Sequence, residues 1–128
     1  MVENVPGAGS NIATDRVAKA AADGYTLLMG GNSAFVINPS LYEQLPFDPI
    51  KDFALISQVF IAANVLAVPP ELPVKTVAEL VALAKAQPGR LSYGHAGVGT
   101  SQHLGAELFK YMAHVDITPV PYRGCLTA

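Results

Sequence analysis

The residues best suited to chemistry lie in one glycine-rich segment, residues 96–103, which reads Ala-Gly-Val-Gly-Thr-Ser-Gln-His between a predicted strand and a predicted helix. Glycines let a ligand approach the backbone closely, and the free N–H groups of a first helical turn carry roughly half a positive charge. This pattern predicts a site for an anion such as a carboxylate. The candidate ligand-binding residues are Gly97, Gly99, Thr100, Ser101 and His103.

The same segment has a purely structural interpretation, which the sequence leaves open. Thr100 can cap the helix through its hydroxyl, and the glycines can simply form a tight turn. His103, near the positive end of a helix, is predicted to be neutral, and a neutral imidazole can donate one hydrogen bond to a carboxylate or simply pack. A second loop of this kind, residues 6–11, precedes the first predicted helix and is a secondary candidate.

Phosphate and dinucleotide sites do not fit these glycine loops. A P-loop has a lysine after its last glycine, whereas Gly99 is followed directly by Thr100. The dinucleotide fingerprint needs a glycine at its sixth position, which is Gln102 in one loop and Ile12 in the other. A lone Gly-x-Gly therefore predicts neither nucleotide nor cofactor.

Catalytic and metal-binding patterns are also missing from the sequence. Ser101 and His103 are two residues apart on a helix, so their side chains diverge by about 200° and cannot hydrogen-bond directly. The chain has no Gly-x-Ser-x-Gly motif, and its three histidines lack the spacing of metal ligands. We expect a protein that is not an enzyme and uses no cofactor and no metal.

Composition narrows the class further. The chain has 128 residues, of which 51% are hydrophobic and 14% charged, with a net charge of -2. This composition favours a packed domain, and the absence of a basic run argues against nucleic acid as a partner. The single cysteine, Cys125, excludes an internal disulfide. The N-terminus lacks the basic and apolar regions of a secretory signal, so we expect the chain as written to stay in the cytoplasm.

The elements that must position the site alternate between short apolar runs and helical patterns, which predicts an α/β fold with mostly parallel strands and flanking helices. Asn32 and Ser33 follow the strand predicted at 25–29, at the carboxyl end where binding loops lie. The predicted strands are 25–29, 53–60, 65–68, 91–93 and 117–122, and the predicted helices begin near residues 10, 76 and 100.

Three local patterns support the helices. Thr76 and Glu79 form a capping box, and Asp15 with Lys19 forms an exposed i, i+4 ion pair. Each helix also has an apolar stripe at helical spacing. The stripes are Ala13, Val17, Ala20 and Ala21; Val77, Leu80, Val81 and Ala84; and Leu104, Leu108, Tyr111 and Met112.

An ordered series of motifs runs across nearly the whole chain. The motifs are Val2-Glu3-Asn4-x-Pro6-Gly7-Ala8-Gly9-x-Asn11-Ile12, Asp23-Gly24-Tyr25-Thr26-Leu27-Leu28, Asn38-Pro39-Ser40-Leu41-Tyr42, Asp48-Pro49-x-Lys51-Asp52-Phe53, Leu91-Ser92-Tyr93, Gly99-Thr100-Ser101-Gln102-His103-Leu104 and Val120-Pro121-Tyr122-Arg123-Gly124. In type and order they resemble the motifs of the receptors of the tripartite tricarboxylate transporter family, also called Bug proteins.

The resemblance implies a fragment of a type II periplasmic-binding-protein-like fold, in which two lobes close like a flytrap on a small carboxylate. The ligand would be a di- or tricarboxylate or an acidic amino acid, delivered to the membrane permease subunits of the transporter. Residues 1–64 would be a partial first lobe and 65–128 a partial second lobe, with Asn64 as the crossing point. By family resemblance the location is periplasmic. Asn32 and Ser33 would face the cleft from the first lobe.

The chain departs from the family pattern at both ends. The family usually begins with an export signal and a first strand, and after Arg123-Gly124 it continues into another helix, whereas this chain ends with Cys125-Leu126-Thr127-Ala128. We expect a truncated chain whose exposed edges are covered by another copy, as a homo-oligomer that domain swapping can produce. The alternative function is a truncated, self-associating protein that has lost ligand binding.

Overall fold

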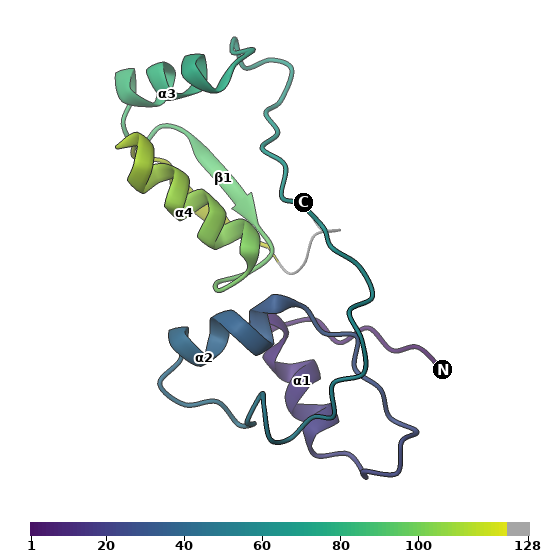
Figure 1. Ribbon diagram of the computed structural model, residues 1–128. Coiled ribbons are helices and arrows are strands. Elements are labelled where there is room, and N and C mark those ends of the chain that lie inside the picture. Colours follow the sequence, from purple (N-terminus) through teal and green to yellow (C-terminus); the bar gives the residue numbers. More distant parts are fainter. Residues whose placement is uncertain (123–128) are drawn as a thin grey trace.

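The structure, a computed structural model, describes residues 1–122, so the predicted features at 123–128 lie outside the described residues. Figure 1 shows how its helices and strands are arranged. None of the helices in this part of the chain is long and apolar enough to cross a bilayer. The elements are the 3-10 turn η1 (Ala8–Ser10), α1 (Asn11–Ala18), the π-helical turn η2 (Ser33–Ile37), α2 (Asn38–Leu41), α3 (Val77–Ala86), β1 (Ser92–His95), α4 (Ser101–Ala113) and β2 (Thr118–Pro121).

The elements form two groups in space. In Figure 1, α1 and α2 lie together at one end of the molecule, and α3, α4 and β1 lie together at the other. The chain between them, after residue 53, runs as a long connection to α3. The glycine segment before α4 lies at the end of its group that faces α2. This arrangement brings the start of α4 close to the N-terminal helices.

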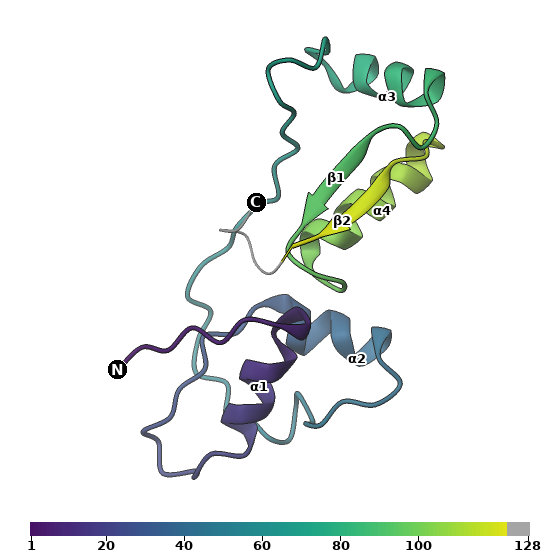
Figure 2. The same cartoon turned by 180° about the vertical axis from the view of Figure 1, so that it is seen from behind.

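The strands β1 and β2 pair in parallel, from Ser92 opposite Thr118 to His95 opposite Pro121. The helix α4 connects them and lies against one face of the pair, as the reversed view of Figure 2 also shows. Crossover by a helix is the usual connection between parallel strands. The strands predicted at 91–93 and 117–122, and their parallel direction, are confirmed.

Two prolines distinguish the two edges of β2. The N–H groups of Thr118 and Tyr122 donate to the carbonyl oxygens of Leu91 and His95, at 2.9 and 2.8 Å. Successive backbone N–H positions of a strand point to opposite edges of the sheet. Because those of residues 118 and 122 point toward β1, those of residues 119 and 121 point away from it. Both are proline, and proline has no N–H to donate. The outer edge of β2 therefore has no donor at these two positions.

The strands predicted at 25–29, 53–60 and 65–68 are not formed. Within residues 1–122 the sheet contains β1 and β2 alone. A strand needs a neighbour to receive its hydrogen bonds, and these segments have none among the described residues. Their apolar side chains are accordingly exposed, as at Tyr25 (91%) and Val65 (86%).

The helices begin where the sequence predicts them. In α3 the capping box is complete, because Thr76 Oγ1 accepts from Glu79 N at 3.2 Å and Glu79 Oε2 accepts from Thr76 N at 3.2 Å. Ser10 occupies the N-cap position of α1, although its side chain makes no capping bond. The predicted ion pair between Lys19 and Asp15 is present at 2.6 Å.

The buried faces differ from the predicted stripes. In α3, Leu80 and Ala84 are buried as predicted, but Val77 is exposed. In α1 the buried residues are the polar Asn11 and Thr14 instead of the alanines. Polar residues can be buried there because each makes a hydrogen bond, including one from Thr14 Oγ1 to Ser10 O at 2.8 Å.

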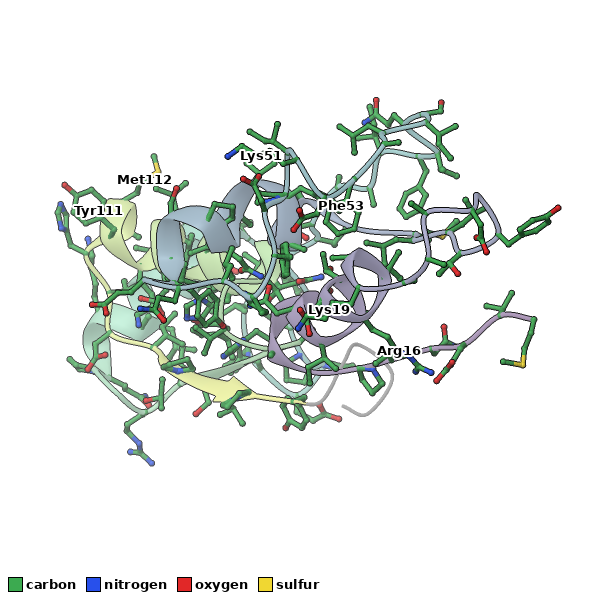
Figure 3. All side chains as sticks on the ribbon, turned by 90° about the horizontal axis from the view of Figure 1, so that it is seen from below. Arg16, Lys19, Lys51, Phe53, Tyr111 and Met112 are labelled. Atoms are coloured by element: carbon green, nitrogen blue, oxygen red, sulfur yellow. The ribbon has the colours of Figure 1, made fainter. Side chains whose placement is uncertain are left out.

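The apolar stripe of α4 faces solvent, whereas its polar side packs on β1. Leu108, Tyr111 and Met112 are exposed, and Figure 3 shows Tyr111 and Met112 at the periphery of the molecule. On the other side, Glu107 accepts a hydrogen bond of 2.7 Å from the Tyr93 hydroxyl of β1. The periodicity therefore predicted the helix correctly but not the face that packs within this chain.

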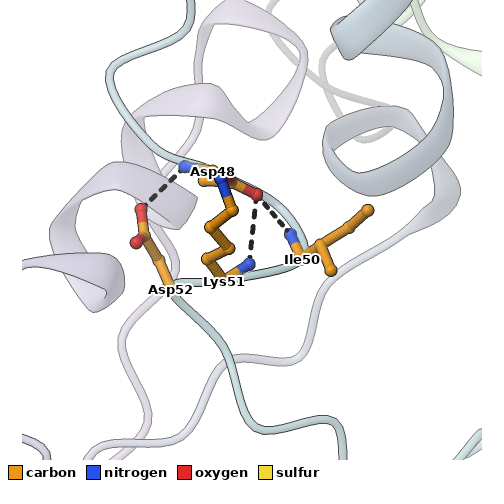
Figure 4. Close-up of polar contacts among 4 residues, drawn as sticks. All are labelled: Asp48, Ile50, Lys51 and Asp52. Atoms are coloured by element: carbon orange, nitrogen blue, oxygen red, sulfur yellow. Dashed lines mark hydrogen bonds and ion pairs between the residues drawn. The ribbon is translucent and has the colours of Figure 1, made fainter.

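A turn at residues 48–52 follows α2. Figure 4 shows Asp48 accepting hydrogen bonds from the N–H groups of Ile50 and Lys51, at 2.9 and 3.1 Å, while its own N–H donates to Asp52. These backbone hydrogen bonds hold the pKa of Asp48 below its ordinary value. The turn returns the chain so that Phe53 packs edge-to-face on Phe47, with ring centroids 6.1 Å apart.

Candidate functional site

Two glycine loops, far apart in the sequence, meet in the structure. The first is residues 7–11, ahead of α1, and the second is residues 97–100, ahead of α4. A Cβ atom placed on Gly9 would lie 3.0 Å from the carbonyl oxygen of Val98. The backbones of the two loops are thus nearly in contact, so the secondary candidate loop lies beside the main one.

Asn38, the first residue of α2, lies between the two loops and is fully buried. Its Nδ2 donates to Gly9 O at 3.1 Å and to Asn11 Oδ1 at 2.6 Å. A Cβ atom on Gly99 would lie 2.8 Å from Asn38 Oδ1 and 2.7 Å from Leu41 Cδ2. Gly9 and Gly99 also have left-handed φ angles, +60° and +80°. Both positions therefore require glycine.

The carbonyl oxygen of the Asn38 side chain is unpaired. Among the described residues no group donates a hydrogen bond to Oδ1, which is buried. Leaving a buried acceptor unpaired costs about 1–3 kcal/mol. Sequence reasoning missed Asn38, because the motif Asn38-Pro39-Ser40-Leu41-Tyr42 has no pattern typical of a binding or catalytic site. Only its position between two distant loops identifies it.

Thr100 is the N-cap of α4. Its Oγ1 accepts from His103 N at 3.4 Å and donates to Gly97 O at 2.7 Å. The capping interpretation is therefore confirmed, and the single hydroxyl proton of Thr100 is used within the loop. Two amides of the loop are also used, since Thr100 N donates to Gly97 O at 3.3 Å and Gly97 N donates to His95 Nδ1 at 3.2 Å.

Three other amides of the segment remain available for a ligand. Within residues 1–122, the N–H groups of Val98, Gly99 and Ser101 donate no hydrogen bond. They surround the first turn of α4, where the helix dipole favours negative charge. These N–H groups are therefore candidate donors to a carboxylate.

The side chain of Ser101 contacts the connection between the two groups of elements. Its Oγ donates to Asn64 Oδ1 at 3.3 Å, and a Cβ atom on Gly105 would lie 3.7 Å from Asn64 Nδ2. From the sequence, Asn64 is expected only as a crossing point between lobes. The structure places its amide beside the first turns of α4, so it is a further candidate residue.

His103 lies on the polar side of α4, against His95 of β1. Their ring centroids are 4.7 Å apart, and His103 Nδ1 is buried without a hydrogen-bond partner among residues 1–122. Burial, and next the nearby His95, lower the pKa of His103, against an opposing effect of Glu107. This direction agrees with the predicted neutral imidazole.

Tyr93 and Glu107 extend this polar cluster. Burial and the hydrogen bond to Glu107 raise the pKa of Tyr93. Hydrogen bonds from Lys110 and Tyr93 lower the pKa of Glu107, and Lys110 Nζ lies 2.8 Å from Glu107 Oε1. These contacts fix α4 on β1 and so fix the direction in which its first turn points.

Asn32 and Ser33 lie on the N-terminal side of the site. Ser33 is buried at the start of η2, and Asn32 precedes it. The turn η2 packs against η1, which contains Gly9. No hydrogen bond within the described chain joins Asn32 or Ser33 to residues 97–103. Their role in ligand binding stays a prediction.

A hollow beside α3 contains none of the predicted site residues and is lined mainly by apolar side chains. The residues that line the hollow are Leu66, Val68, Val74, Lys75, Thr76, Val77 and Leu80.

In residues 1–122, no three His, Cys, Asp or Glu side chains gather in a way that could hold a metal ion.

Comparisons with known proteins agree on one family. The profile described as "Tripartite tricarboxylate transporter family receptor" matches residues 1–128. The chain is 41% identical over 124 residues to a UPF0065 protein of Bordetella pertussis, in an alignment that covers 97% of this chain and 38% of the relative. The chain thus spans well under half the length of this relative.

Two solved structures share the fold. "Structure of a periplasmic transporter" has a TM-score of 0.91 and 41% identity, covering 95% of this chain and 41% of that one. "R. palustris Rpa4515 with adipate" has a TM-score of 0.79 and 42% identity, covering 89% of this chain and 38% of that one. The predicted fold class, a periplasmic-binding-protein-like α/β fragment, is confirmed.

The contact between the glycine loops can be tested with a matched pair of variants. Gly99→Ala and Gly24→Ala both place alanine at a left-handed φ, +80° and +81°, at a shared cost of about 1–2 kcal/mol. Only at Gly99 does the new methyl group meet other atoms, so we expect a further loss of about 1–3 kcal/mol. Urea unfolding measures both, and equal losses would contradict the close contact.

His103 predicts a pH dependence of stability. Because its folded pKa is lowered from 6.5, the folded chain binds fewer protons than the unfolded chain just below that pH. The contribution of neutral His103 is complete above 6.5 and is lost as the pH falls through the lowered pKa. In urea unfolding between about pH 7.5 and pH 5, His103→Gln should reduce this slope. An unchanged slope in His103→Gln would refute the assignment.

Proposed function

Because the chain belongs to the tripartite tricarboxylate transporter receptor family, we propose that it is a solute-binding receptor fragment that holds a small carboxylate at the first turn of α4. The single observation that carries the proposal is the set of N–H groups at Val98, Gly99 and Ser101, which donate no hydrogen bond within residues 1–122. A helix N-terminus attracts negative charge, and these donors lie in and just before the first turn of α4. The proposed function is binding alone, without a covalent step.

The ligand we propose is a di- or tricarboxylate or an acidic amino acid. A similar structure contains adipate, a dicarboxylate, which supports this class. One carboxylate of the ligand would accept hydrogen bonds from the amides at the start of α4. The other polar contacts to the ligand would come from the N-terminal group of elements, on the far side of the contact between the two glycine loops. Asn32 and Ser33 are the proposed ligand contacts on this N-terminal side. His103 would support the first turn of α4 from the side of β1.

We propose that residues 1–64 and 65–128 belong to the two lobes of such a receptor. Gly9, Asn38 and Leu41 then stand on one side of the cleft, with Val98 and Gly99 on the other. Closure of the lobes excludes water and strengthens the charge-assisted hydrogen bonds to a carboxylate. Location in the periplasm and delivery to a membrane permease belong to the same proposal.

The site can be tested by deleting one amide without changing the helix. Ser101→Pro removes the Ser101 N–H at the first position of α4, where proline fits. The preceding Thr100 already has the extended φ and ψ, -76° and 157°, that proline requires. Ser101→Ala is the matched control, because it removes the hydroxyl but keeps the N–H.

The measurement is a thermal shift with adipate, citrate and glutamate. A ligand at 100 times its Kd should stabilise the native chain and Ser101→Ala by about 2.7 kcal/mol. We expect Ser101→Pro to lose most of this shift while keeping its own melting temperature near that of the control. A ligand shift that Ser101→Pro retains, or no shift in the native chain, would refute the proposed site.

Exposed apolar side chains favour a second candidate, a self-associating chain that has lost ligand binding. Leu55, Ile61 and Val65 are 81%, 86% and 86% exposed on the connection before α3. Exposed apolar segments without paired backbone favour association with another chain. The occupant we propose is a second copy, because each copy presents the same unpaired segment.

Light scattering tests this candidate. One copy has a mass of 13.4 kDa, and the native chain should give at least twice that. Ile61→Lys should shift the mass toward one copy at the same concentration, because a lysine at the contact must lose its hydration. Ile50→Lys, at an equally exposed isoleucine outside the connection, should not. A folded native monomer would exclude self-association.

A further inference from the structure

We infer that His95 is a positioning residue that holds the glycine segment 96–100 while its ring is neutral and releases that segment when the ring is protonated. Because the segment contains amides of the proposed carboxylate site, such a release would regulate that site, and in this respect the inference rests on the proposed function. The test follows the segment itself and needs no ligand, so it can fail without the proposed function failing.

One hydrogen bond ties the glycine segment to the strand before it. The segment runs from the end of β1 to the start of α4 (Figure 1). His95, the last residue of β1, is buried, and its Nδ1 accepts from the N–H of Gly97 at 3.2 Å. The carbonyl oxygen of Gly97 accepts from Thr100 Oγ1 at 2.7 Å. The peptide groups on the two sides of Gly97 thus connect the strand to the cap of α4.

This bond requires a neutral His95 ring whose proton is on Nε2. A ring nitrogen accepts a hydrogen bond only when it carries no proton, and both nitrogens of a charged imidazolium are donors. No rotation of a protonated ring can therefore restore an acceptor for the N–H of Gly97. Two N–H groups would face each other beside a buried ring, and we expect the segment to move away from β1.

The titratable groups that face His95 lie on β1 and α4. The ring centroid of Tyr93 is 5.7 Å away and that of His103 is 4.7 Å away. Glu107 and Lys110, which influence His103, form an ion pair of 2.8 Å. The strand β2 and the glycine segment contain no charged residue. Because Glu107 already accepts from Tyr93 and Lys110, the expected effect of a proton on His95 is the lost bond and not a new ion pair.

The release is expected to stay local. The hydrogen bond from Tyr93 to Glu107 holds α4 on β1, and the Thr100 side chain caps α4; neither contact involves the His95 ring. Gly97 and Gly99 lie between these fixed points, and glycine permits large changes of backbone conformation. Histidine is the side chain whose charge ordinarily changes between about pH 5 and pH 8, so this range is the one to examine.

Nuclear magnetic resonance of the native chain, from about pH 8 to pH 5, tests the inference. The nitrogen shifts of the His95 ring should show a proton on Nε2 alone at the start, and the Gly97 amide signal should move with the same midpoint as His95 protonation. The buried Leu80, whose N–H donates to Thr76 O at 3.1 Å in α3, reports global unfolding and should not move with that midpoint. A Gly97 signal that does not follow His95, a proton on Nδ1 at the start, or a change shared with Leu80 would overturn the inference.

Two variants of His95 separate the acceptor from its sensitivity to protons. An asparagine side chain can accept from the backbone N–H two residues on but does not titrate, so His95→Asn should keep the neutral-form Gly97 signal throughout this pH range. His95→Ala removes the acceptor and should give the acid-form signal at every pH. A Gly97 signal that still follows pH in folded His95→Asn would refute the inference.

His103→Gln is the matched control, because it removes the neighbouring ring and keeps the His95 acceptor. The Gly97 signal should still follow His95 in this variant, and a lost response would assign the effect to His103 and overturn the inference. If circular dichroism shows that the His95 variants do not fold, the native chain still decides, by whether Gly97 and His95 share one midpoint.

Discussion

The arrangement of the site depends on the close approach of two backbone loops around one buried amide. Asn38 joins Gly9 and Asn11 by two hydrogen bonds, and Gly99 approaches the other end of the same amide so closely that no side chain fits. The hydrogen bonds fix Asn38 to the loop ahead of α1, and the absence of a Cβ at Gly99 allows the loop ahead of α4 to approach the same amide. Every proposed ligand contact, including the unpaired amides at the start of α4, is positioned by this contact.

A second set of contacts determines the direction of α4. Its polar side meets β1 through Tyr93 and Glu107 and through the paired rings of His95 and His103. His95 also accepts from Gly97 N, which links the sheet directly to the glycine loop. The loop geometry is thus fixed from both sides, by the sheet behind it and by Asn38 in front. This is how a short strand and one helix can position backbone donors without large side chains.

Local features were predictable from the sequence, and features that depend on distant partners were not. The Thr76 capping box and the Thr100 cap involve residues within one turn, so their spacing determines them. The strands near 25–29 and 53–68 depend on neighbours that the described residues do not supply. Asn38 was identified only from the structure, where the glycine loops ahead of α1 and α4 meet. The motif series nevertheless predicted the fold class, because its motifs are spread in the family's order over nearly the whole chain.

The two prolines of β2 have a consequence for how the sheet can grow. Pro119 and Pro121 face away from β1 and offer no N–H, so another strand cannot extend a regular ladder on that side. Among residues 1–122, the edge that a new strand could join is that of β1. If two chains paired through their β1 strands, the β2 strand of each chain would form an outer edge of the combined sheet. Both outer edges would then lack N–H donors at Pro119 and Pro121. Growth along this sheet would therefore stop at a closed pair instead of continuing into a fibre.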